Sequence, residues 1–206
     1  MKEIAIKNGK LYLLPIIHGL VGEEKKVEKA FNEILPDCIA IGIAPEDIEI
    51  VGKIKGEEEY EISFQYQCYL MHLSNYGKIS LPPLDIKIAH ELANKNKIPI
   101  HAIDIDDNEY ADLLTKNVSI FSLIRHSRKV KKLAKKKFNA KNAEEFVMQW
   151  NKEINSIKAF KRIEEIREER MAHNLAKLCN SYKKILAIVP FEKYEGIKKR
   201  LESYKR

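Results

Sequence analysis

The sequence predicts a single α/β domain over residues 1–206, with a mixed, mostly parallel sheet, helices on both faces and a long helical excursion at about 119–180 before the last strand. Short apolar runs, typical of buried parallel strands, alternate with amphipathic helical patterns. An Asn-Gly pair between two apolar runs near the N-terminus indicates a β-hairpin. No internal repeat or low-complexity linker divides the chain, and its 45% apolar residues can supply one core.

The strands are predicted in order along the chain. EIAIK and KLYLLPII form the hairpin around Asn8-Gly9, where both turn positions are expected at positive φ, and the second strand ends at His18. Three later segments, CIAIGIA (38–44), IPIHAID (98–104) and KILAIV (184–189), are apolar enough to lie buried on both faces of a parallel sheet.

The helices are predicted by apolar residues spaced three and four apart. The first spans about 23–35, a short polar helix or loop follows CIAIGIA (38–44), and an aromatic-rich helix lies near 60–74. Asp85 is predicted to cap the helix IKIAHELANKN, and the acidic turn DDNE opens another helix. Residues 119–180 are predicted to be almost entirely helical, with a break near 138–142, and a terminal helix follows the last strand.

The formal net charge of +7 comes from one segment, because residues 125–137 hold eight basic and no acidic residues, and the rest of the chain carries 7 − 8 = −1. The eight basic residues are Arg125, Arg128, Lys129, Lys131, Lys132, Lys135, Lys136 and Lys137. As a helix over 119–138, this segment is amphipathic, and we expect its apolar stripe to pack on the sheet and its cations to be solvated. A basic amphipathic helix can alternatively bind nucleic acid, an anionic membrane or an acidic partner; of these, weak, non-specific nucleic-acid binding through phosphates is the alternative function we expect of this basic patch.

Several classes of protein are excluded or disfavoured by composition. No run reaches the roughly 18–20 apolar residues of a membrane span, and the N-terminus lacks a signal-peptide core. The three distant cysteines are typical of free thiols in a reducing cytoplasm. We therefore expect a cytoplasmic protein with no membrane partner; its richness in Ile, Lys and Glu is compatible with a thermophilic source. Motifs of serine hydrolases, zinc peptidases and nucleotide-binding loops do not occur.

The carboxyl ends of the predicted strands are where a ligand site is expected, because parallel α/β sheets bind ligands at that edge. The strands deliver His18, Asp104, Glu192 and Lys193 there. A histidine with carboxylates is a donor set that a divalent metal can use, with His18 and Asp104 as its ligands. Surface-exposed strand ends are also commonly polar without any function.

Four segments of the chain resemble the TraB/PrgY family, which is related to the wider Tiki and ChaN-like group. LLPIIHGL carries His18 where the family has G-T-x-H, and Pro36-Asp37 leads into CIAIGI where the family has P-D-V-V-A-V-E-L. IREERMA (166–172) resembles E-R-D-x-Y-M-A, and AIVPFEKYEGI (187–197) resembles A-V-V-G-x-G-H-x-x-G-I. A fifth segment, IPIHAIDIDD, resembles the family's apolar strand that ends in I-D-R, with Asp104 in the place of that aspartate.

The resemblance implies a degenerate member of that family, because several of its characteristic residues are replaced. The family's strand glutamate is Gly42, its second histidine is Lys193 and its first motif glycine is Pro15. Arg167 and Glu168 supply the arginine and the acidic residue at the second and third positions of the family's E-R-D motif. The metal-binding or catalytic set implied by the family is thereby reduced, and the charge of the site shifts towards positive.

From these observations we expect a non-catalytic protein that binds a small anionic ligand, peptide or protein partner at His18, Asp104, Arg167, Glu168, Glu192 and Lys193, with no cofactor. The alternative is a metal-dependent hydrolase with a reduced site, in which a divalent metal would activate water. The long helices at 146–178 could also pair two subunits as a homodimer. The C-terminal membrane region of many family members is expected to be lacking.

Overall fold

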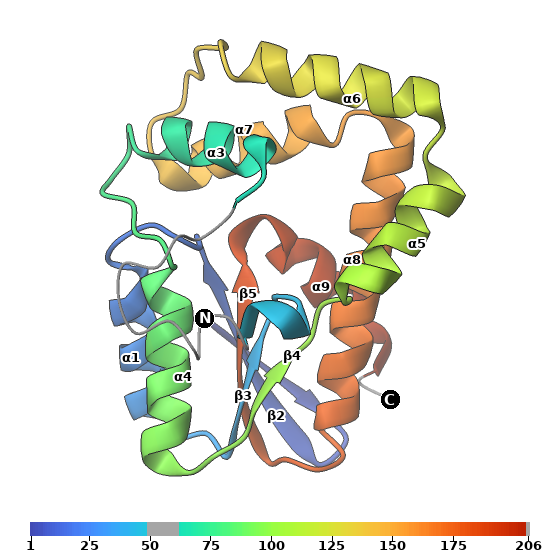
Figure 1. The fold of residues 1–206 in the computed structure, drawn as a ribbon. Coiled ribbons are helices and arrows are strands. Elements are labelled where there is room, and N and C mark those ends of the chain that lie inside the picture. Colours follow the sequence, from blue (N-terminus) through green and yellow to red (C-terminus); the bar gives the residue numbers. More distant parts are fainter. Residues whose placement is uncertain (49–61, 205–206) are drawn as a thin grey trace.

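The computed structural model describes residues 1–48 and 62–204, and within them it confirms the predicted α/β class. One sheet has the strand order β1-β2-β5-β3-β4. Its strands are β1 (Lys2–Ile6), β2 (Gly9–Ile16), β3 (Cys38–Ile41), β4 (Ile100–Ala102) and β5 (Lys184–Pro190). The β1–β2 pair is antiparallel and the other pairs are parallel, so the sheet is mixed and mostly parallel (Figure 1).

The helices fall close to their predicted positions. They are α1 (Glu23–Ile34), α3 (Phe64–Leu73), α4 (Leu84–Asn96), α5 (Asp107–Asn117), α6 (Ile120–Leu133), α7 (Ala143–Ile154), α8 (Lys158–Leu178) and α9 (Tyr194–Leu201), with short 3-10 turns η1 (Phe191–Lys193) and η2 (Glu202–Tyr204). The short polar helix or loop and the start of the helix near 60–74 fall partly on residues 49–61, which lie outside the described residues.

Alternation along the strands divides the core between the two faces of the sheet. Ile39 and Ile41 point to the face covered by α1 and α4, whereas Cys38 and Ala40 point to the face covered by α8 and α9. Because successive strand residues point to opposite faces, a strand covered on both sides must be apolar throughout. The four residues of β3 are all buried, as this requires.

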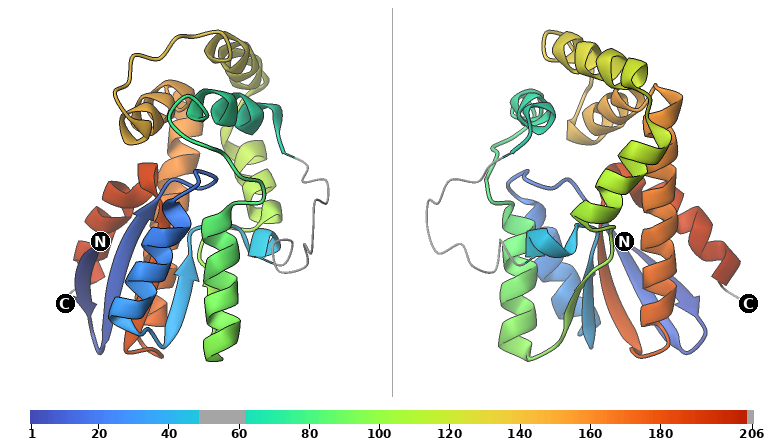
Figure 2. Two further views of the ribbon diagram at one scale, coloured as in Figure 1. Left: turned by 90° about the vertical axis from the view of Figure 1, so that its left-hand side faces the viewer. Right: turned by 45° about the vertical axis from the view of Figure 1, so that its right-hand side comes forward.

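A second layer of helices, α3, α6 and α7, lies above the carboxyl ends of the parallel strands, and we call it the cap (Figure 2). Phe146 and Trp150 of α7 centre an aromatic cluster that also holds Tyr69 and Phe138. The expectation that the apolar stripe of the basic helix packs on the sheet is wrong, because α6 packs against the other cap helices.

The N-terminal hairpin has its turn one residue earlier than predicted. Ile6 pairs with Gly9, so the loop is Lys7-Asn8, and Lys7 has a φ of 50°. Gly9 is extended, and a Cβ atom there would lie 2.8 Å from the backbone oxygen of Tyr182. The glycine is therefore required by close packing of the hairpin against the loop before β5, and not by its φ angle.

The three cysteines are buried free thiols, and burial raises the pKa of Cys38 to about 12 and that of Cys179 to about 11. A search of residues 1–48 and 62–204 finds no helix with the length and apolarity needed to cross a bilayer.

Candidate ligand pocket at the strand ends

The carboxyl ends of β2, β5, β3 and β4 open into a pocket of about 640 Å³ beneath the cap. Its floor includes His18 after β2 and Glu192 and Lys193 after β5. Tyr69 and Trp150 line it from the cap. The pocket therefore lies where the sequence predicts a ligand site, and its size is in the range of small-molecule sites.

His18 is held by a carboxylate that the sequence assigns to another role. Its Nδ1 atom lies 2.5 Å from Oδ2 of Asp85, which also accepts the backbone N–H of Gly19 at 3.4 Å through Oδ1. Asp85 was predicted to cap α4, but Pro83 is at the N-cap, and the Asp85 side chain is fully buried against His18. The carboxylate fixes the imidazole so that Nδ1 carries a proton and Nε2 is the second functional atom.

The Nε2 atom of His18 is buried and has no hydrogen-bond partner among the described residues. Burial disfavours protonation of His18, but the Asp85 carboxylate outweighs it and, with smaller contributions from Glu192 and Glu23, raises the pKa of the imidazole. The protonated form is thus favoured relative to an ordinary histidine, and in that form Nε2 is a hydrogen-bond donor.

Glu192 is a carboxylate of the pocket whose charge acts on both His18 and Arg167. Burial raises its pKa, although its own backbone N–H and the charges of His18 and Arg167 act in the opposite direction. Burial thus shifts Glu192 towards the protonated carboxyl form, while the Asp85 carboxylate shifts His18 towards the imidazolium form.

The remaining cations of the pocket are paired with carboxylates. Arg167 reaches Asp104 through Nη2 to Oδ2 at 2.5 Å and reaches Glu164 through Nη1 at 2.9 Å. The other oxygen of Glu164 contacts the ammonium of Lys193. Burial lowers the pKa of Lys193 to about 8, while the Asp104 carboxylate acts against that change. Asp104, Arg167, Glu164 and Lys193 form one chain of ion pairs from the end of β4 across α8 to η1.

The predicted site residues are brought together with one exception. His18, Arg167, Glu192 and Lys193 line the pocket, and Asp104 supports Arg167 from beneath. Glu168 lies outside the pocket, where Oε2 accepts from Nη1 of Arg200 at 2.6 Å. Adjacent residues of a helix point about 100° apart, and while Arg167 lines the pocket, Glu168 points towards α9.

The charge of the pocket is less positive than the sequence indicates. The cationic shift expected from Lys193 is offset by Glu164, and Asp47 and Asp107 also line the pocket. The cations of the ion-pair chain already have carboxylate partners. Among the described residues that line the pocket, the Nε2 atom of His18 is the buried polar side-chain atom without a hydrogen-bond partner.

Two residues of the site were missed by sequence reasoning for different reasons. Glu164 lies three residues before Arg167 on α8, so helical spacing could have identified it as a partner. Asp85 lies 67 residues from His18 in sequence, and no local pattern connects the two.

The donor set offers little to a metal ion. Within the described parts of the chain, no three His, Cys, Asp or Glu side chains gather closely enough to hold one. Of the two ligands named from sequence, Asp104 is engaged by Arg167, whereas His18 is held by Asp85 through Nδ1 and keeps Nε2 unpartnered.

The eight basic residues of 125–137 lie apart from the pocket, on α6 and the residues that follow it. Lys129 and Lys136 pair with Glu153 of α7 at 3.6 and 2.6 Å. These two and four of the other basic residues line a separate groove of about 730 Å³ beside α7.

Comparison with known proteins finds neither a family model nor a curated protein that matches the chain. The resemblance to the TraB/PrgY family accordingly stays a prediction from the five segments quoted above.

Proposed function

We propose that the strand-end pocket binds a small ligand with an anionic or hydrogen-bond-accepting group, and that His18 recognises that group through Nε2. The observation that carries the proposal is the buried, unpartnered Nε2 atom on an imidazole whose Nδ1 is held by Asp85. A buried donor without a partner costs about 1–3 kcal/mol, and a ligand acceptor would remove that cost. Tyr69 and Trp150 supply the aromatic wall that small-ligand sites commonly have.

The proposal is tested by thermal unfolding of the full chain with phosphate, sulfate, acetate and succinate, each added separately. A ligand at ten times its Kd stabilises the folded state by about 1.4 kcal/mol, which raises Tm by about 3–6 °C for a chain of this size. We expect at least one anion to give such a shift in the wild type and none in His18→Ala, each measured against its own ligand-free Tm. His90→Ala, on α4, is the matched control and should retain the shift.

Two results would contradict the proposal: no anion shifts the wild type, or the shift survives in His18→Ala. Elemental analysis of the purified chain tests the metal-dependent hydrolase separately. Stoichiometric zinc, manganese or iron that is lost in His18→Ala would favour the hydrolase over metal-free ligand binding.

A second candidate function is metal-independent acid–base catalysis, favoured by the 2.5 Å contact between His18 and Asp85 and by the raised pKa of Glu192. A histidine oriented by a carboxylate, next to a second carboxyl group whose pKa is raised by burial, can move a proton to and from a bound substrate. Turnover of a small ester or amide panel that persists with chelator and disappears in His18→Ala would support catalysis over binding alone.

A further inference from the structure

Helix α6 contacts α8 and the other two cap helices along one side only. His126 stacks on Phe160 of α8 with ring centroids 3.9 Å apart, and its Nε2 atom lies 2.8 Å from Gln65 of α3. Val130 and Leu133 are buried in the aromatic cluster of the cap. These contacts fix the rotation of α6 about its axis, so the opposite side faces outward.

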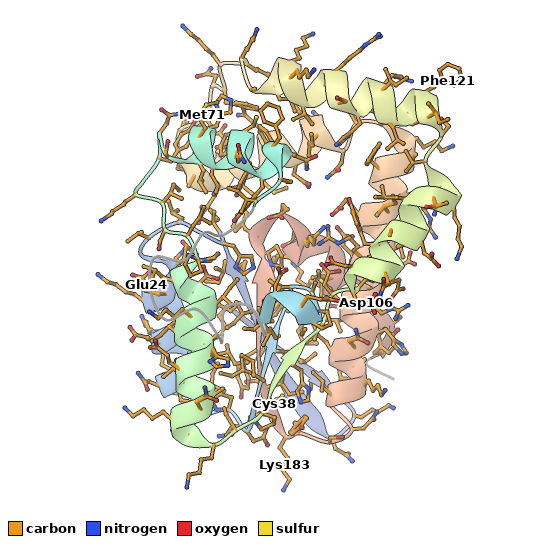
Figure 3. The ribbon with its side chains drawn as sticks, viewed as in Figure 1. Glu24, Cys38, Met71, Asp106, Phe121 and Lys183 are labelled. Atoms are coloured by element: carbon orange, nitrogen blue, oxygen red, sulfur yellow. The ribbon has the colours of Figure 1, made fainter. Side chains whose placement is uncertain are left out.

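The first turns of α6 expose four large apolar residues between positions 120 and 124. Ile120 is 73% exposed, Phe121 80%, Leu123 46% and Ile124 44%. Figure 3 shows Phe121 projecting from the outer corner at which α6 begins. Single exposed apolar residues are ordinary, but a contiguous group of this size marks a surface that another apolar phase covers.

The same outward side becomes cationic along the helix. Ile120, Ile124, Arg128 and Lys131 are spaced by four, four and three residues, which places them on one stripe of α6. Lys135 follows in the turn after the helix ends at Leu133. The stripe is therefore apolar in its first half and basic in its second half.

The cations of this surface are largely unneutralised. The side chains of six basic residues form no ion pair or hydrogen bond with any part of the chain that the structure describes, in contrast to Lys129 and Lys136. The six are Arg125, Arg128, Lys131, Lys132, Lys135 and Lys137. The groove of about 730 Å³ beside them contains a single carboxylate, that of Glu153, and can accept phosphate groups.

We infer that the outward side of α6 docks the protein onto an anionic lipid bilayer. A helix that lies in the bilayer interface buries apolar side chains at the acyl boundary and places its basic residues among anionic headgroups. The apolar half of the stripe then leaves water, and the basic half gains anionic partners.

A nucleic acid would neutralise the cations but leave the aliphatic residues at 120–124 in water, and a second copy of α6 would bring like charges together. The inference departs from the expectation of no membrane partner, and its basis is that 120–124 are exposed and not packed inward.

The test is co-sedimentation of the full chain with vesicles of phosphatidylcholine alone and with about 30% phosphatidylserine, at low salt and at about 0.5 M salt. We expect binding to the anionic vesicles at low salt, release at high salt and no binding to neutral vesicles.

Two pairs of variants separate the apolar and basic contributions. Phe121→Ser should weaken binding to anionic vesicles, whereas Leu35→Ser, which changes another exposed apolar residue at the end of α1, should not. Replacing Arg128, Lys131 and Lys135 by Gln should lower the vesicle partition coefficient at least about tenfold. The same change at Lys25, Lys87 and Lys95, which lie exposed on α1 and α4, removes equal charge and should leave binding unchanged.

The inference is overturned if anionic vesicles do not bind the wild type, or if each control variant behaves like its partner. Tighter binding to a DNA or RNA duplex than to vesicles, unaffected by Phe121→Ser, would assign the cations to nucleic acid. A dimer in gel filtration that Phe121→Ser converts to a monomer would assign the apolar residues to a second copy. Thermal unfolding of every variant checks that the fold is retained.

Discussion

Gly42 and Pro190 are neighbours at the ends of two adjacent strands, and each restricts what the other position can hold. A Cβ atom on Gly42 would lie 2.6 Å from Cδ of Pro190 and 3.4 Å from Cα of Val189. The first contact is too short for a rigid proline ring to relieve by rotation. In the resemblance to the TraB/PrgY family, position 42 corresponds to a glutamate, and its Cβ would meet the same obstruction.

We predict that Gly42→Ala lowers the free energy of unfolding by about 1–3 kcal/mol, because the added methyl group overpacks the strand ends. Pro190→Ala removes Cδ and should relieve most of that cost. The double variant should then be more stable than the sum of the two single changes, with a coupling free energy of about 1 kcal/mol or more in urea denaturation. Simple additivity would show that the Pro190 ring is not the cause.

The pair formed by His18 and Asp85 predicts a pH dependence of stability. Because the pKa of His18 is raised in the folded state, its stabilisation is fully present below the ordinary histidine pKa of 6.5 and is lost as pH rises through the folded value. Asp85→Asn removes the buried carboxylate and should destabilise the protein by about 3 kcal/mol at pH 6. The difference from wild type should shrink as pH increases.

Urea denaturation at several pH values, with NMR titration of the His18 ring, measures this effect. The imidazole pKa should fall in Asp85→Asn. Asp112→Asn changes an exposed carboxylate on α5 whose ionic partner among the described residues is Lys116, and it should alter neither quantity. A stability difference that is constant with pH would contradict the assigned role of Asp85.

At the scale of elements, sequence patterns predict what depends on local spacing and miss what depends on packing partners. The unbroken apolar run of CIAI predicts a fully buried β3, because a strand covered on both sides leaves no position for a polar residue. The Asn8-Gly9 turn is displaced by one residue, because Gly9 is selected by its contact with Tyr182 and not by turn geometry.

What the sequence predicts about the site and about α6 is limited in the same way, by packing partners that local patterns do not reveal. Arg167 lies on α8 and was named through the resemblance to the TraB/PrgY family. His18, Glu192 and Lys193 could be gathered from sequence, because topology alone brings parallel strand ends to one edge. Asp85 could not, because an acidic residue near the start of a helix is equally well explained as a cap. Periodicity identified α6 as amphipathic, but it could not show that the cap covers only the side with Val130 and Leu133.

At the scale of the whole molecule, α8 connects the cap to the sheet. Phe160 and Ile163 near its start pack with α5 beside the cap, whereas Met171 and Leu175 belong to the core on one face of the sheet. Between them, Arg167 is tied to Asp104 at the end of β4. Helix α8 therefore joins the two layers, because Phe160 near its start stacks on His126 of the cap and Arg167 farther along is ion-paired at the strand end.

This connection predicts that the cap and the sheet unfold together. Trp150, the single tryptophan of the chain, is 5% exposed in the cap, so its fluorescence reports the cap, whereas far-UV circular dichroism reports all the helices and strands. In urea the two transitions of the wild type should coincide. Phe146→Ala, which empties the centre of the aromatic cluster, should lower the stability by about 3–5 kcal/mol and move both midpoints equally. A fluorescence transition at lower urea than the dichroism transition, in either protein, would show that the cap melts on its own and that α8 does not couple the two layers.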